Sequence, residues 1–160
     1  MRVGVLLPSR FEDPGEFLAD ARAMEEAGVD SVWMEDGDGY DPMLALAAIA
    51  AVTGTVRLGL ILPDSPSHTA AGLERGFETL QRLSRERGIV GASQGKKVET
   101  GTETWLRVEV PTDRDAWART LEQSHPDFDG VLVPLGPRLL DILRHPEDAI
   151  DRSDLQLAQG

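Results

Sequence analysis

The stretch DSVWMEDGDGYDPMLALAAIAAVTGTVRLGLILP, residues 30–63, contains two candidate strands with a candidate helix between them. Asp41 and Pro42 follow the first apolar run as a helix N-cap and a proline at the first helical position. The helix MLALAAIAAV is apolar nearly all round, Gly54 marks its end, and VRLGLILP (56–63) is a second apolar run. Continuous apolar runs of this length are typical of strands buried on both faces, so the unit predicts parallel strands joined by a crossover helix.

The same unit recurs on both sides of this stretch. VGVLLP (3–8) is an apolar strand, and the helix after it has Asp13 as N-cap and Gly28 as stop. A helix over 69–86, ended by Gly88, has Leu73, Phe77, Leu80 and Leu83 on one side. The remaining expected elements are strands at 88–93, 104–110 and 130–135 and helices at 113–123 and 137–145. This alternation predicts an α/β fold in a single domain, residues 1–160.

One connection departs from the alternation of strands and helices. Only QGKKVETGTE (94–103) separates two expected strands, whereas a parallel crossover needs a dozen or more residues and usually a helix. Those strands either pair antiparallel or belong to one sheet in a non-sequential way. The tail segment LQLA (155–158) could add a short terminal strand.

Composition restricts the classes of function. The formal net charge of -12 argues against nucleic acid and anionic membrane as partners, because like charge repels phosphate. The chain has no cysteine, which excludes disulfide scaffolds, thiolate metal sites and cysteine nucleophiles. The opening apolar run is too short for a signal peptide or a membrane span, so we expect a cytoplasmic protein.

Three segments, taken in order, resemble the N-terminal half of the luciferase-like flavin- or deazaflavin-dependent oxidoreductases. They are FLADARAMEEAGVDSVWMED (17–36), DPMLALAAIAAVTGTVRLGLILP (41–63) and SHTAAGLERGFETLQRLSRERGIVGASQG (67–95). The resemblance implies a TIM-barrel-like (β/α) fold, but the family's eight-stranded barrel needs more residues than this chain has. We therefore expect a shortened member with an internal deletion near 93–103 and an incomplete barrel of about six to seven strands. An open barrel would leave unpaired strand edges, which pairing across a two-fold axis could protect.

The resemblance implies an oxidoreductase of the monooxygenase type. Such a protein would use reduced flavin (FMN) or deazaflavin on a small organic substrate that the sequence does not identify. The alternative is a degenerate, non-catalytic member that acts as a flavin-binding protein or a dimeric scaffold. Family members usually dimerise, so the resemblance also implies a homodimer. No residue of this sequence is assigned a catalytic role.

Candidate cofactor-binding residues follow the strand that ends in SVWMED. Asp36 matches an acid that the family places near its ligand, while Gly37 stands where the family commonly has a histidine. Tyr40 either stacks on or hydrogen-bonds to a ligand, or is an exposed loop residue. Counted from Asp36, the loop lacks the ligand pattern of an EF-hand, and no histidine pair has metal-ligand spacing, so we expect no metal site.

The remaining candidates lie later in the chain. His68 matches a family histidine before the third helix, with either a structural or a substrate-proximal role. Ser93 lies in GASQGKK (91–97), which could receive a phosphate or form a polar β-turn. Arg114 lies in EVPTDRDAW, at the place of the family's glycine-containing phosphate loop, and could pair with a phosphate although no glycine is present. The three tryptophans are interpreted as packing residues.

Overall fold

The structure is a computed structural model that describes residues 1–124 and 126–144. The segment 155–158, expected as a terminal strand, lies outside the described residues. The elements are β1 (Arg2–Leu6), α1 (Pro14–Glu26), β2 (Ser31–Glu35), α2 (Pro42–Val52), β3 (Arg57–Leu62), α3 (Ala70–Ser84), β4 (Gly88–Gln94), β5 (Lys97–Glu99), β6 (Thr104–Arg107), α4 (Arg114–Ser124), β7 (Gly130–Pro134) and α5 (Leu139–Leu143).

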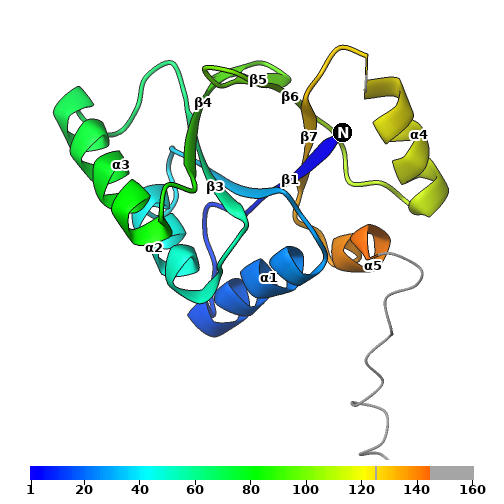
Figure 1. Ribbon diagram of the computed structural model, residues 1–160, viewed down its shortest axis with the longest axis horizontal. Helices are drawn as coiled ribbons and strands as arrows, with labels where there is room; N and C mark the ends of the chain where they lie inside the picture. The colour runs from blue at the N-terminus through cyan, green and yellow to red at the C-terminus, as the bar shows by residue number, and fades with distance from the viewer. Residues whose placement is uncertain (125, 145–160) are drawn as a thin grey trace, which may run out of the picture.

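The strands form a closed barrel of seven strands in chain order, with the helices outside it (Figure 1). Each strand pairs with the next along the chain, and β1 pairs in parallel with β7, with Val3 opposite Val131. The expected strand number and the α/β barrel architecture are confirmed. The expectation of an open barrel was wrong, because the pairing of β1 with β7 leaves no unpaired strand edge in the part of the chain that the structure describes.

The short strand β5 explains why the connection at 94–103 contains no helix. After a turn in which Gly95 has a φ of +61°, β5 pairs antiparallel with β4 and then with β6. The two expected strands therefore do not pair with each other, because β5 lies between them. Its sequence, KVE, buries only Val98, and no helix covers its outer side in Figure 1. A three-residue strand with one inward side chain has too little alternation to be predicted from sequence.

The helix starts follow the expected capping chemistry. The Asp13 carboxylate accepts hydrogen bonds from Gly15 N at 2.6 Å and Glu16 N at 3.2 Å. The Asp41 carboxylate accepts from the first turn of α2 in the same way, at 2.9 and 3.2 Å. Among the described helices, none combines the length and apolarity that crossing a membrane requires.

The end of α3 differs from the prediction. The helix stops at Ser84, and Arg85 and Glu86 adopt left-handed backbone conformations with φ of 57° and 64°. Gly88, expected as the helix stop, instead begins β4. Leu83, expected on the packed side, is 59% exposed.

Two indole rings fill the barrel interior. Trp33 and Trp105 are fully buried, with ring centroids 5.4 Å apart and ring planes at 63°. Glycines make room for them: a Cβ on Gly59 would lie 2.1 Å from the Trp33 ring, and a Cβ on Gly130 would lie 2.4 Å from the Trp105 ring. Trp117 packs into the core outside the barrel, so the packing role expected of all three tryptophans is confirmed.

Candidate functional site

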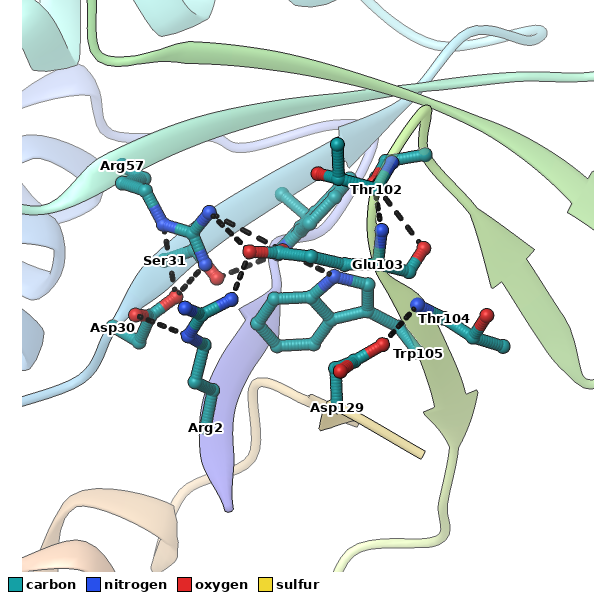
Figure 2. Close-up of polar contacts among 11 residues, drawn as sticks. Arg2, Asp30, Ser31, Arg57, Thr102, Glu103, Thr104, Trp105 and Asp129 are labelled. Atoms are coloured by element: carbon teal, nitrogen blue, oxygen red, sulfur yellow. Dashed lines mark hydrogen bonds and ion pairs between the residues drawn. The ribbon is translucent and has the colours of Figure 1, made fainter. Parts of the chain in front are cut away.

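The end of the barrel where most strands begin is closed by charged side chains (Figure 2). Glu103 pairs with Arg2, accepts a hydrogen bond from Arg57 Nη1 at 3.1 Å, and accepts another from Trp105 Nε1 at 3.1 Å. Asp30 Oδ2 accepts a hydrogen bond from Arg57 Nη2 at 2.5 Å. These groups neutralise one another, and barrels of this kind bind their ligands at the opposite end. A ligand site is therefore expected where β2, β4 and β6 reach the other end, the barrel mouth.

Three polar side chains meet at the barrel mouth. Arg107 donates to both carboxylate oxygens of Glu35, from Nη2 at 2.9 Å and from Nη1 at 3.2 Å. Arg107 Nη2 also donates to Ser93 Oγ at 3.2 Å. Glu35 and Arg107 each lie two residues after an inward-facing tryptophan, so strand alternation turns both into the barrel. The mouth thus has a carboxylate, a guanidinium and a hydroxyl within hydrogen-bonding distance of one another.

One donor at the mouth has no partner. Arg107 Nε is buried and, among the described residues, no group accepts a hydrogen bond from it. Ser93 Oγ accepts from the guanidinium, which leaves its own hydroxyl hydrogen to donate to another group. Buried polar groups are normally paired, so Arg107 Nε is an exception, and the Ser93 hydroxyl is the donor at the mouth that is suited to an oxygen acceptor from a ligand.

Two cavities adjoin Arg107. A cavity of about 240 Å³ at the mouth is lined by apolar Leu6, Leu132 and Pro134 and by Lys96 and Arg107. A second cavity, of about 480 Å³, continues along the chain after β6 to α4 and shares Lys96 and Arg107 with the first. The two cavities share four lining residues, and we refer to them together as the mouth groove.

Asp36 lies in a different network from Glu35. Asp36 is 3% exposed, and its carboxylate accepts from Ser67 N at 2.7 Å and from Ser67 Oγ at 2.5 Å. His68 Nδ1 is 3.1 Å from Ser67 Oγ and 3.8 Å from the nearer Asp36 oxygen, and His68 Nε2 is 3.0 Å from Asp41 Oδ2. This network ties the loop after β2 to the loop after β3. The structure therefore brings the predicted residues Asp36 and His68 together.

The other predicted residues lie apart from this network. Tyr40 is 46% exposed and packs edge-on against Phe11 at 5.0 Å between ring centroids, with the Arg10 guanidinium 5.5 Å from its ring. Arg114 donates from Nη2 to the carbonyl oxygen of Asp141 in α5 at 2.8 Å. Ser93 is the predicted site residue that lies with Arg107 and Glu35 at the mouth.

The start of α4 is already occupied by a carboxylate. Asp113 accepts a hydrogen bond from Ala116 N at 2.7 Å, and this bond lowers the pKa of Asp113. An anion at this helix start would have to replace that carboxylate. Of the two interpretations of GASQGKK (91–97), the structure shows a polar turn, which links β4 to β5 after Gln94.

Sequence reasoning missed Glu35 and Arg107. The available signal was the alternation along each strand, since Trp33 faces inward and Glu35 must then face inward, while Asp36 faces the opposite way. Their pairing across the barrel joins residues 72 positions apart and depends on β5, which the sequence did not predict.

Comparisons with known proteins identify the family of this chain. A family model described as luciferase-like monooxygenase matches residues 1–129. The F420-dependent glucose-6-phosphate dehydrogenase of Kineococcus radiotolerans is 33% identical over 119 residues, with 68% of this chain and 34% of the relative covered.

Two solved structures share the fold. Monooxygenase RslO1 from Streptomyces bottropensis matches with a TM-score of 0.50 and 28% identity, covering 57% of this chain and 32% of that one. The long-chain alkane monooxygenase LadA matches with a TM-score of 0.51 at 13% identity, covering 60% of this chain and 31% of that one. At this low identity, the match shows similarity of fold alone. The chain spans about a third of the length of these proteins.

Proposed function

Because this chain belongs to the luciferase-like monooxygenase family, we propose that it is an oxidoreductase that binds reduced flavin or deazaflavin at the barrel mouth and acts on a small organic substrate. The observation that carries the proposal is the convergence of Glu35, Ser93 and Arg107 at the end of the barrel where such folds bind ligands. The F420-dependent relative supports a deazaflavin as the first cofactor to test.

The residues at the mouth fit a cofactor with a flat ring and polar edges. Leu6, Leu132 and Pro134 offer an apolar surface for the ring, while Ser93 offers a hydroxyl donor and Arg107 a positive charge. When bound, a reduced flavin or deazaflavin supplies a hydride or, for flavin, reacts with dioxygen. The chain itself would orient the ring and exclude water from one side of it.

Each polar group would have a separate task in this proposal. Glu35 is the carboxylate at the mouth and would exchange a proton with the substrate, with Arg107 fixing its orientation through two hydrogen bonds. Asp36 and His68 would set the shape of the neighbouring loops, and Tyr40 would form part of the exposed rim. Arg114 points toward α5 and would not contact the cofactor.

The test is an equilibrium titration with FMN and with the deazaflavin F420, read by cofactor fluorescence. We expect micromolar or tighter binding of one of them, and at least about tenfold weaker binding in Arg107→Met, since a charge-assisted hydrogen bond is lost. Arg114→Met is the matched control, because it removes the same charge outside the mouth. No binding of either cofactor up to millimolar concentration would refute the proposal, and equal losses in both variants would refute the placement at the mouth.

A second candidate is a non-catalytic member that serves as a dimeric scaffold. α2 contains no polar side chain, yet its Leu44 is 72% exposed, and Leu83 of α3 is 59% exposed beside it. These residues line an outer groove of about 380 Å³ between α2 and α3. Because the described strands form a closed barrel, two copies would meet through such a helix surface and not through strand edges. Apolar surface of this kind is typical of an interface, and a second copy of the chain is the proposed occupant. A dimer mass in solution without cofactor binding would favour this candidate.

A further inference from the structure

The two cavities of the mouth groove combine apolar and charged residues. The cavity at the mouth has the apolar surface of Leu6, Leu132 and Pro134 together with Lys96 and Arg107. Lys96 and Arg107 also line the cavity beside α4. A ligand that fits the cavity at the mouth would therefore join an apolar part to a charged part.

Lys96 and Arg107 are held next to each other by the backbone. Arg107 N donates to the carbonyl oxygen of Lys96 at 2.7 Å, which links the turn before β5 to the end of β6. The Nη atoms of Arg107 are occupied by Glu35 and Ser93, whereas Lys96 is exposed. Two cationic residues therefore line one cavity, and Lys96 is the one exposed to a ligand.

The groove favours a single negative charge over a double one. Glu109 lines both cavities, and it would repel a second negative charge on a ligand. A carboxylate has one charge, which suits one exposed lysine beside a guanidinium that already pairs with Glu35. A phosphate dianion would carry the additional charge toward Glu109.

We propose that Lys96 and Arg107 bind the carboxylate of an amphiphilic organic acid, whose apolar chain points toward Leu6, Leu132 and Pro134, where the cofactor ring is placed. This inference rests on the proposed function, because it names the substrate class of the same site. The carboxylate lies on the β5–β6 side of the mouth, and the apolar chain extends toward the position of the cofactor ring. The extra hairpin at β5 is what supplies Lys96 to this site.

The adjacent lysines provide a matched pair of variants. Lys97→Met removes the same charge as Lys96→Met, but Lys97 lies on the outer side of β5, with Nζ 5.6 Å from the centre of the Phe128 ring. Both lysines are exposed, so neither change is expected to unfold the protein, which circular dichroism checks. Calorimetric titration of the full chain with octanoate, and with neutral octanamide of the same shape, measures the contribution of the carboxylate.

We expect octanoate to bind at least about tenfold more tightly than octanamide, and Lys96→Met to remove that preference while Lys97→Met retains it. Equal binding of the two compounds, or equal effects of the two variants, would overturn the inference. Binding of FMN or F420 without octanoate binding would overturn it and leave the proposed function standing. Octanoate binding that depends on Lys96, without binding of either cofactor, would support the carboxylate site and refute the oxidoreductase proposal.

Discussion

Replacing Gly59 by alanine tests whether the indole of Trp33 fills the barrel. The added Cβ would lie 2.1 Å from Cδ2 and from Cε3 of Trp33, whereas carbon atoms in contact are normally about 3.5–4.0 Å apart. Trp33 is fully buried and its Nε1 donates to Ser31 Oγ at 2.8 Å, so the ring cannot move aside cheaply. Overpacking of cores costs about 1–3 kcal/mol, and this contact predicts a loss of about 3 kcal/mol in the free energy of unfolding.

Urea unfolding followed by circular dichroism measures this loss. With a denaturant slope of about 2 kcal/mol per molar urea, the midpoint should fall by about 1.5 M. Gly101→Ala is the control, because a Cβ at that position meets no atom within 4 Å. Trp33→Leu should destabilise the protein by itself but make room for the new methyl group, so Gly59→Ala should cost under about 1 kcal/mol in that background.

Two results would refute the reasoning. One is a Gly59→Ala variant within about 0.5 kcal/mol of the parent protein. The other is simple additivity in the double variant, because additivity would mean that the methyl group and the indole do not compete for the same space. Either result would imply that the barrel interior has room to spare, and the closed seven-stranded packing would need revision.

Three further predictions concern other parts of the molecule. Burial raises the pKa of Glu25, but hydrogen bonds from residues 54–56 outweigh burial and lower it to about 2. Glu25 should therefore stabilise the fold above its unfolded pKa near 4.5 and lose that effect as pH falls toward 2. Glu25→Gln should lower the free energy of unfolding by about 1–2 kcal/mol at pH 7. It should also flatten the dependence of thermal stability on pH between about 2 and 4.5. An unchanged pH profile would contradict this prediction. Asp36→Ala should cost about 1–3 kcal/mol in chemical denaturation, because it removes the buried carboxylate that holds Ser67 and the loop after β3. Asp38→Ala is the control and should cost little, because Asp38 is exposed, and equal losses would count against the Asp36 network. If the outer groove joins two copies, Leu44→Glu should halve the mass measured by light scattering, and an unchanged dimer mass would place the interface elsewhere.

The sequence was a partial guide to the candidate site. It named Asp36 and His68 separately as candidate cofactor-binding residues, and the structure joins them through Ser67. It placed Ser93 at a strand end but did not identify the partner that Ser93 meets there. Glu35 and Arg107 were missed because their pairing depends on which strands become neighbours in space.

Short-range features of this protein were determined by sequence alone. Apolar runs predicted the buried strands, and Asp13 and Asp41 predicted where helices begin, because caps and alternation depend only on residues a few positions apart. The tertiary structure decided the closure of the barrel and the chemistry of its mouth. A three-residue strand between β4 and β6 adopts its conformation only when both neighbours are present to pair with it, and that pairing brings Arg107 against Glu35. The contacts that define the site therefore depend on cross-strand register, which no local sequence pattern contains.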